Sequence, residues 1–352
     1  MRVVLAAGST ETARIDGLSA AGADAEAMAY TPGADAEVLV YGDVVRAPSV
    51  PVSPTGTPTP ALVTRAAHEV VGFDVTVVDA GLAEPTGAPT VSVGARPGED
   101  VREADPVPTA PGAFTAARAL GRSLPDDHLV LAETIPGGTT TALGVLRALG
   151  EDGAVSSSLP TNPIERKREV VAEGLAASGL DVGDCEKDPR RAVRRMGDPV
   201  LATLAGVATG ALAAGKRVTL AGGTQQLAVA ALARHDGATG PLDVATTSYV
   251  AGTDRDVGGE AAGEVVSFRE TARRFDCEPT VTDPQFDRGH VGFGGYVGGE
   301  AKEGVGMGGA VALANATGDL AAVRERAGEL YDRLVDAGVD EATGGESTTE
   351  DA

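Results

Sequence analysis

Apolar and polar positions along this chain follow two periods, and the two periods alternate. Short apolar runs rich in Val, Leu and Ala are typical of buried strands, whereas apolar positions spaced three and four residues apart are typical of helices. The pattern predicts strands over residues 2–7, 37–41, 75–78, 90–93, 129–132, 216–220 and 242–250. It predicts helices over residues 61–71, 112–123, 142–149, 163–178, 198–214, 225–234, 310–314 and 319–336. This alternation indicates an α/β fold with a mostly parallel, doubly wound (Rossmann-like) sheet flanked by helices, with a smaller helical or irregular subdomain.

The length of 352 residues is enough for one large α/β domain or two smaller ones. We expect residues 1–339 to form a single domain, whose smaller subdomain comes from the N- and C-terminal segments. Residues 47–60 are dense in Pro, Ser and Thr, which favours an extended surface connection. Residues 340–352 are acidic and lack periodicity, so we expect a disordered tail.

The segment after the strand at residue 129 combines a carboxylate with a glycine turn. Glu133 ends the apolar run, and Pro136-Gly-Gly138 and a threonine cap (Thr139, Thr140, Thr141) follow before the next helix. A strand, a glycine turn and a capped helix form a cradle for a phosphate, because unpaired N–H groups and the positive end of the helix dipole face the anion. If this segment is a phosphate cradle, Gly137, Gly138, Thr139 and Thr140 bind substrate. The alternative is a tight turn between strand and helix that binds no ligand.

Two other loops share this chemistry. Gly222, Gly223 and Thr224 repeat the order of strand, paired glycines, threonine and helix, and Ser156 and Ser157 follow an expected strand end. Loops that follow the strands of a parallel sheet lie at one edge of that sheet. We therefore expect these residues to gather around one substrate-binding site.

A glycine-rich stretch near the C-terminus, residues 289–309, contains a second candidate carboxylate, Glu303, followed by Gly304 and Gly306. Glycine at this density allows close approach of the backbone to a ligand. A glutamate in such an apolar setting can have a raised pKa suited to proton abstraction. A flexible lid with Glu303 as an ordinary exposed acid, paired with Lys302, is an equally good explanation of the pattern.

Composition narrows the class of protein. Acidic residues outnumber basic ones 51 to 29, and only four lysines occur. An acidic surface argues against nucleic-acid and anionic-membrane partners, and it is typical of proteins from salt-rich cytoplasm. No apolar run approaches the roughly 18 residues of a membrane span. Cys185 and Cys277 are isolated, which favours a reduced, cytoplasmic protein. Neither a P-loop, a dinucleotide-binding glycine motif nor a histidine pair with metal spacing occurs, so we expect no cofactor and no metal.

These motifs resemble the nicotinate-nucleotide–dimethylbenzimidazole phosphoribosyltransferase family, and in particular its archaeal branch. The segments that carry the resemblance are Tyr30-Thr-Pro-Gly-Ala-Asp-Ala-Glu37, Pro51-Val-Ser-Pro-Thr-Gly56, Glu133-x-x-Pro-Gly-Gly-Thr-Thr-Thr141, Ser156-Ser-Ser158 and Lys302-Glu-Gly-Val-Gly306. Bacterial members carry similar E-x-x-x-G-x-T-T and E-G-x-G stretches. The chain departs from them at Ala221-Gly-Gly-Thr224, where their loop is of the Asp-Gly-Phe type.

The resemblance implies transfer of the phosphoribosyl group from nicotinate mononucleotide to 5,6-dimethylbenzimidazole or a related base. Nicotinate is released and alpha-ribazole phosphate is formed for the lower ligand of a cobamide. Glu303 then matches the family's proposed general base, and we assign Glu133 to the ribose or its developing positive charge. The resemblance also implies a homodimer. Two alternatives stay open: a non-catalytic nucleotide-binding regulator, and a different phosphoribosyl- or phosphate-transfer enzyme of cofactor synthesis.

Overall fold

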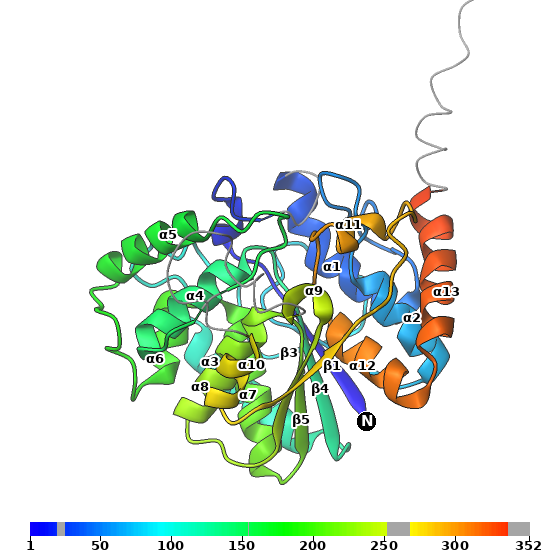
Figure 1. The fold of residues 1–352 in the computed structure, drawn as a ribbon. Coiled ribbons are helices and arrows are strands. Elements are labelled where there is room, and N and C mark those ends of the chain that lie inside the picture. The colour runs from blue at the N-terminus through cyan, green and yellow to red at the C-terminus, as the bar shows by residue number, and fades with distance from the viewer. Residues whose placement is uncertain (20–24, 154, 252–267, 337–352) are drawn as a thin grey trace, which may run out of the picture.

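The fold is built on one sheet of seven parallel strands. The computed structural model describes residues 1–19, 25–153, 155–251 and 268–336 (Figure 1). The strand order is β3-β2-β1-β4-β5-β6-β7, and every pair is parallel. The strands are β1 (Arg2–Ala7), β2 (Asp74–Asp79), β3 (Thr90–Ser92), β4 (His128–Thr134), β5 (Arg217–Ala221), β6 (Leu242–Thr247) and β7 (Glu278–Thr282). The order reverses between β1 and β4, and open α/β sheets bind their ligands beside the carboxyl ends of strands at such a reversal.

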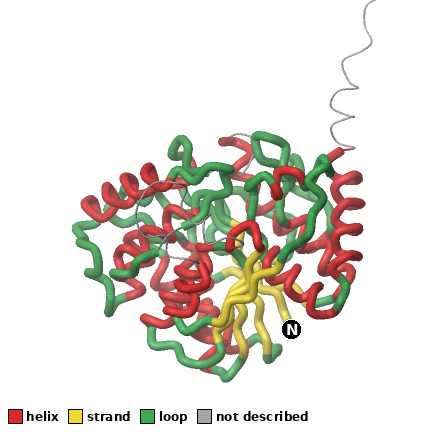
Figure 2. Tube along the Cα trace, viewed as in Figure 1, coloured by secondary structure: helices red, strands yellow, loops and turns green. Residues whose placement is uncertain are grey.

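Helices cover both faces of the sheet, so the structure confirms the expected α/β class (Figure 2). The helices are α1 (Ala25–Tyr41), α2 (Ala61–Val71), α3 (Ala110–Ser123), α4 (Gly138–Leu149), α5 (Ile164–Ala177), α6 (Pro189–Met196), α7 (Pro199–Ala213), α8 (Thr224–His235), α9 (Ser248–Ala251), α10 (Phe268–Arg274), α11 (Gly294–Val297), α12 (Met307–Thr317) and α13 (Leu320–Tyr331), with short turns η1 (Glu11–Arg14) and η2 (Asp332–Asp336).

Side chains of β1 alternate between two cores, as a strand buried on both faces requires. Val4 and Ala6 belong to the core under α3, α4, α7 and α8. Val3 and Leu5 belong to the core under α1, α2, α12 and α13. The second face is therefore covered by helices from both ends of the chain, and α2 lies beside α13 (Figure 1).

The pattern was wrong at residues 37–41, which were predicted as a strand after a turn. These residues form the last turns of α1, and Pro32 lies inside the same helix. A short apolar run fits a buried helix as well as a strand, and here Ala34, Val38 and Leu39 are fully buried against the sheet face. Burial in the tertiary structure therefore decides the conformation.

Smaller differences occur elsewhere. The expected strand at 242–250 ends at Thr247, where α9 begins, and the sequence did not predict α6, α10 or β7. The serines at 156–158 follow a coil rather than a strand. The expected tail at 340–352 lies outside the described residues.

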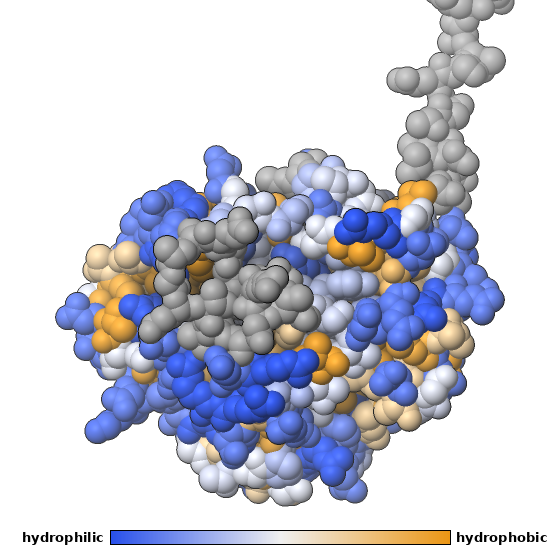
Figure 3. All heavy atoms as spheres, in the orientation of Figure 1, coloured by the Kyte–Doolittle hydropathy of each residue, from blue (hydrophilic) through white to orange (hydrophobic). Residues whose placement is uncertain are grey.

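The surface is strongly polar. Hydrophilic residues dominate the visible face (Figure 3), in a chain whose formal net charge is −22. None of the helices in the described ranges combines the length and the apolar character that a membrane crossing needs.

Candidate functional site

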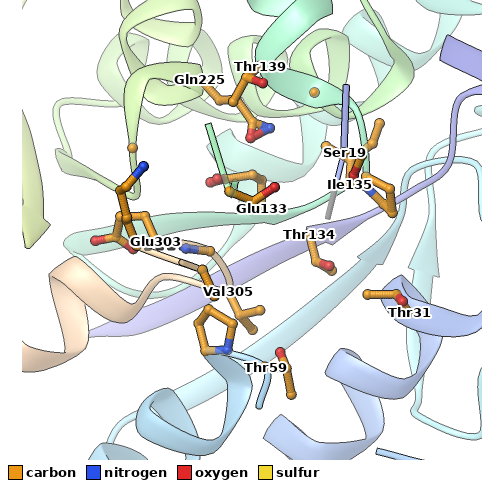
Figure 4. A pocket seen from close by; sticks show the side chains of 18 of the residues that line it. Ser19, Thr31, Thr59, Glu133, Thr134, Ile135, Thr139, Gln225, Glu303 and Val305 are labelled. Carbon is orange, nitrogen blue, oxygen red and sulfur yellow. Dashed lines mark hydrogen bonds between the residues drawn. The ribbon is translucent and has the colours of Figure 1, made fainter. Parts of the chain in front are cut away.

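A pocket opens at the carboxyl ends of the central strands, where the strand order reverses. Its lining comes from the end of β4, the turn into α4, the start of α8, and residues 301–305 before α12. Further lining comes from α1, from residues 51–60, and from the serines at 156–158. Figure 4 shows Glu133, Glu303, Gln225 and several threonines around this pocket. Segments far apart in the sequence therefore meet at the edge where loops of a parallel sheet converge.

Glu133 lies at the end of β4 with only 4% of its surface exposed. Gln226 Nε2 donates a hydrogen bond to its Oε2, whereas Gln226 Oε1 is buried without a partner among the described residues. Burial raises the pKa of Glu133 to about 8, and the nearby Asp198 carboxylate adds to the rise. Gly222 has a φ of +156°, and a Cβ on it would lie 2.7 Å from Glu133 Oε2. The second glycine pair therefore makes room for this carboxyl group.

Glu303 supplies the second carboxyl group of the pocket. Its Oε2 accepts a hydrogen bond from Gly304 N at 3.0 Å. Its Oε1 is buried, with no hydrogen-bond partner in the described part of the chain. Burial raises the pKa of Glu303 well above its ordinary value, and the Glu133 carboxylate adds to the rise. Val305 N donates to Glu133 O at 2.8 Å, so the segment that carries Glu303 is fixed to the end of β4.

The turn from β4 into α4 differs from the expected threonine cap. Gly137 caps the helix in the left-handed conformation, with a φ of +78°, and no side chain in the described ranges caps α4. Thr139 lines the pocket, whereas Thr140 is fully buried. Thr141 donates its hydroxyl to Gly138 O and to Asp198. The helix therefore begins at Gly138, four residues before the predicted start at residue 142, because the positive φ of Gly137 lets the chain turn directly from β4 into α4.

A second helix, α8, also begins at the pocket, at Gly223, and no side chain of the described residues caps it. Its Thr224 Oγ1 accepts a hydrogen bond from Ser156 N at 2.8 Å and pairs with Ser156 Oγ at 3.0 Å. The serine segment is therefore fixed to the start of α8. Two helix N-termini facing one pocket favour a bound anion.

Two lysines hold the serine segment from behind. Lys167 is fully buried on α5 and donates from Nζ to Ser156 O at 2.6 Å. Lys302 donates from Nζ to Ser157 O and Leu159 O, both at 3.0 Å. Burial lowers the pKa of Lys167 to about 7, and the positive charge of Lys302 lowers it further. Half of the four lysines in the chain thus lie beside the pocket, and sequence reasoning missed Lys167 although their scarcity was a signal.

The side of the pocket formed by α1 was also missed. Asp35 is 3% exposed and accepts hydrogen bonds from the hydroxyls of Thr59 and Thr134, each at 2.6 Å. Thr57–Pro60 are buried and line the pocket, so the proline-rich segment is more than the surface connection that its composition favoured. The segment turns back at residues 53–57, so that residues 54–56 are exposed while residues 57–60 lie against the pocket.

Most of the candidate residues line this pocket: Glu133, Gly137, Gly138, Thr139, Ser156, Ser157, Gly223, Thr224, Glu303 and Gly304. The others lie behind it. Thr140 is buried in α4, Gly222 packs against Glu133, and Gly306 caps α12 with a φ of +77°. A Cβ on Gly306 would lie 2.8 Å from Ala132 Cβ, which explains that glycine by packing.

Among the described residues, no group of three or more His, Cys, Asp or Glu side chains is placed to hold a metal ion.

Comparison with known proteins places the whole chain in a family. No family model matches the chain. It is 57% identical over 333 residues to the UPF0284 protein VNG_1572C of Halobacterium salinarum, covering 94% of this chain and 97% of that protein. It is 39% identical over 344 residues to a UPF0284 protein of Methanothermobacter thermautotrophicus, covering 94% and 92%.

The fold matches a solved structure of nicotinate-nucleotide–dimethylbenzimidazole phosphoribosyltransferase from Thermus thermophilus. The TM-score is 0.60 at 19% identity, and the match covers 96% of this chain and 85% of that one. A structure of CobT from the same organism matches with a TM-score of 0.58 at 18% identity. The resemblance drawn from the motifs is thereby confirmed in the fold. By its sequence relatives, the chain belongs to the UPF0284 family.

Proposed function

We propose that this protein transfers the phosphoribosyl group of nicotinate mononucleotide to 5,6-dimethylbenzimidazole or a related base. The observation that carries the proposal is the pair of buried carboxyl groups, Glu133 and Glu303, in one pocket with two uncapped helix N-termini. Carboxylates repel an anionic phosphate and so do not strengthen its binding. Their presence in the pocket therefore favours a catalytic function over a function in binding alone. The likeness in fold to the Thermus phosphoribosyltransferase supports the same choice.

The reaction replaces one bond to the anomeric carbon by another. The bond from C1′ of the ribose to the pyridinium nitrogen breaks, and its electron pair stays on nicotinate. A ring nitrogen of the incoming base forms the new bond to C1′, and the N–H proton of that base passes to the Glu303 carboxylate. General-base assistance of this kind contributes roughly 10²- to 10⁴-fold to a rate.

Like charges in a low-dielectric pocket disfavour ionisation of both carboxyl groups at once. In the free protein the pKa of Glu133 is about 8, so this group is largely protonated at neutral pH and can donate a hydrogen bond to a ribose hydroxyl. The pyridinium charge of the donor substrate favours the ionised form, which then stabilises positive charge on the ribose as nicotinate leaves. Both roles place Glu133 at the sugar and leave the proton to Glu303.

We assign the phosphate of the substrate to the side of the pocket opposite α1. The starts of α4 and α8 and the serine segment held by Lys167 and Lys302 surround this region. Helix N-termini favour a bound anion. We further propose that the acidic surface adapts the protein to high salt, as its relative from Halobacterium suggests.

The test is incubation of the purified protein with nicotinate mononucleotide and 5,6-dimethylbenzimidazole in molar KCl. We expect equimolar release of nicotinate and formation of alpha-ribazole phosphate, measured by chromatography. Binding of the nucleotide without release of nicotinate would instead indicate a regulator. Release only with another ribosyl donor would indicate a different transferase.

A matched pair of variants tests the role of Glu303. Glu303→Gln keeps the shape of the side chain and should lower the transfer rate by at least about 10²-fold. Glu325→Gln, an exposed change on α13, should leave the rate unchanged. Near-normal turnover of Glu303→Gln would remove this residue from the base role.

A further inference from the structure

The end of the pocket beside α1 is lined by oxygen atoms that can only accept hydrogen bonds. We call this surface, formed by Thr31, Asp35, Thr59 and Thr134, the acceptor wall. A threonine hydroxyl has one hydrogen to donate. Thr59 and Thr134 donate theirs to Asp35, and Thr31 donates its own to Ala27 O. The four side chains can therefore accept further hydrogen bonds but have no hydrogen left to donate.

Asp35 makes this wall unusual. Its carboxyl group is buried, and no Lys or Arg in the described part of the chain forms an ion pair with it. Two hydroxyl donors fill only half of the roughly four acceptor positions of a carboxylate. A buried carboxylate in that state is costly unless a further donor reaches it. Because Asp35 lines the pocket, a bound ligand can supply that donor.

The Thr59 end of the acceptor wall lies next to the segment that carries Glu303. A Cβ on Gly304, next to Glu303, would lie 3.5 Å from Pro60 Cγ, and Thr59 precedes that proline. Thr64 Oγ1 donates to Val305 O at 2.9 Å, which fixes the segment after Glu303 to α2. In Figure 4, Thr31 and Thr59 lie at the end of the pocket away from Thr139 and Gln225, with Val305 near Thr59.

Pro58, Pro60 and Val305 also line the pocket, and their apolar side chains have no hydrogen-bond donor. Apolar side chains of this kind can pack against a flat ring. A planar base between these residues would present one edge to the Glu303 carboxylate and the remote edge to the acceptor wall. The phosphate site at α4 and α8 stays free for the nucleotide.

We infer that the acceptor wall selects an incoming bicyclic base that carries a hydrogen-bond donor, an O–H or N–H, on the ring edge away from its reacting nitrogen. This inference rests on the proposed function and names the substrate class of the same site. Hydroxyl- and amino-substituted bases share this chemistry. The two methyl groups of 5,6-dimethylbenzimidazole cannot satisfy Asp35, so that base should be a poorer substrate than a donor-bearing one.

The test compares bases that differ only in the donor. We would measure kcat/KM with nicotinate mononucleotide for 5-hydroxybenzimidazole, 5-aminobenzimidazole and 5-methoxybenzimidazole. The methoxy compound keeps the oxygen of the hydroxy compound but has no hydrogen to donate. We expect the hydroxy or the amino base, or both, to exceed the methoxy base by at least about tenfold, because a site built for a donor rejects analogues without one.

Two variants localise the effect. Thr134→Val removes a hydroxyl of the acceptor wall at nearly constant volume, and Asp35→Asn replaces one acceptor by a donor. Both should lower the ratio of hydroxy to methoxy turnover by several-fold. Thr209→Val removes a buried hydroxyl on α7, outside the pocket, and should leave that ratio unchanged.

Equal turnover of the hydroxy, amino and methoxy bases by the unaltered protein would overturn the inference while leaving the proposed function intact. Absence of transfer with every base would instead overturn the proposed function. Calorimetric binding of the same bases then still tests the acceptor wall, since equal affinities would overturn the inference on its own.

Discussion

Glu133 should make the folded protein less stable as the pH rises from about 5 to 8, and Glu133→Gln should remove this loss. No Lys or Arg in the described ranges pairs with this carboxyl group, and burial raises its pKa from 4.5 to about 8. Between these two values the folded state keeps a proton that the unfolded chain releases. Folding therefore takes up a proton, and stability declines by about 1.4 kcal/mol per pH unit from this group.

A glutamine at position 133 does not titrate, so the difference between the two proteins grows with pH. Summed from pH 4.5 to pH 7, this difference makes the free energy of unfolding of the variant about 3 kcal/mol higher than that of the unaltered protein. The new amide nitrogen can also donate to Gln226 Oε1, which is buried without a partner among the described residues. For a chain of 352 residues, about 3 kcal/mol raises Tm by about 4 °C.

The assay is chemical unfolding followed by circular dichroism at pH 5, 6, 7 and 8, in molar KCl throughout. Glu325→Gln on α13 serves as the control, since it removes a carboxylate that is exposed. We expect the advantage of Glu133→Gln to increase steadily over this range, together with a large loss of transfer activity. An advantage that stays constant from pH 5 to 8 would refute the assignment of a buried, protonated carboxyl group.

Three further results should follow. On the proposed function Glu303 must be ionised to accept a proton, and burial raises its pKa. We therefore expect kcat/KM to fall as the pH is lowered through that pKa, and Glu303→Gln to lose this pH dependence. Gly138→Val places carbon atoms where the Gln225 amide lies, so it should raise the Kd for nicotinate mononucleotide at least about tenfold, measured by calorimetry. Gly112→Ala on α3, where a Cβ meets open space, should leave the Kd unchanged. An unaltered Kd in Gly138→Val would contradict the assignment of the phosphate to this turn. With a net charge of −22, the protein should lose stability on transfer from molar KCl to dilute buffer, and an unchanged Tm would contradict self-repulsion of the surface.

The parts of the site that could be predicted are those with a local signature. Glu133 and its glycine turn follow a buried strand directly, and the parallel sheet then places the Gly222–Thr224 loop beside them. The residues that were missed, Asp35 and Lys167, lie within helices. Tertiary packing brings Asp35 to the pocket wall and Lys167 to the serine segment behind the pocket. Nothing in the spacing of α1 or α5 marks these two side chains as different from charges on a solvated face. The error at residues 37–41 has the same origin, because a buried helix and a buried strand share the same apolar composition.

The fixing of residue 305 to Glu133 has a consequence for the newly made protein. Glu133 and Glu303 are 170 positions apart in the sequence. At usual rates of translation, about 10–30 s separate the appearance of the two residues. Until the later segment arrives, the carbonyl of Glu133 lacks its Val305 donor and the pocket lacks the carboxyl group that we propose as its proton acceptor. On the proposed function, an incomplete chain on the ribosome therefore cannot catalyse the transfer.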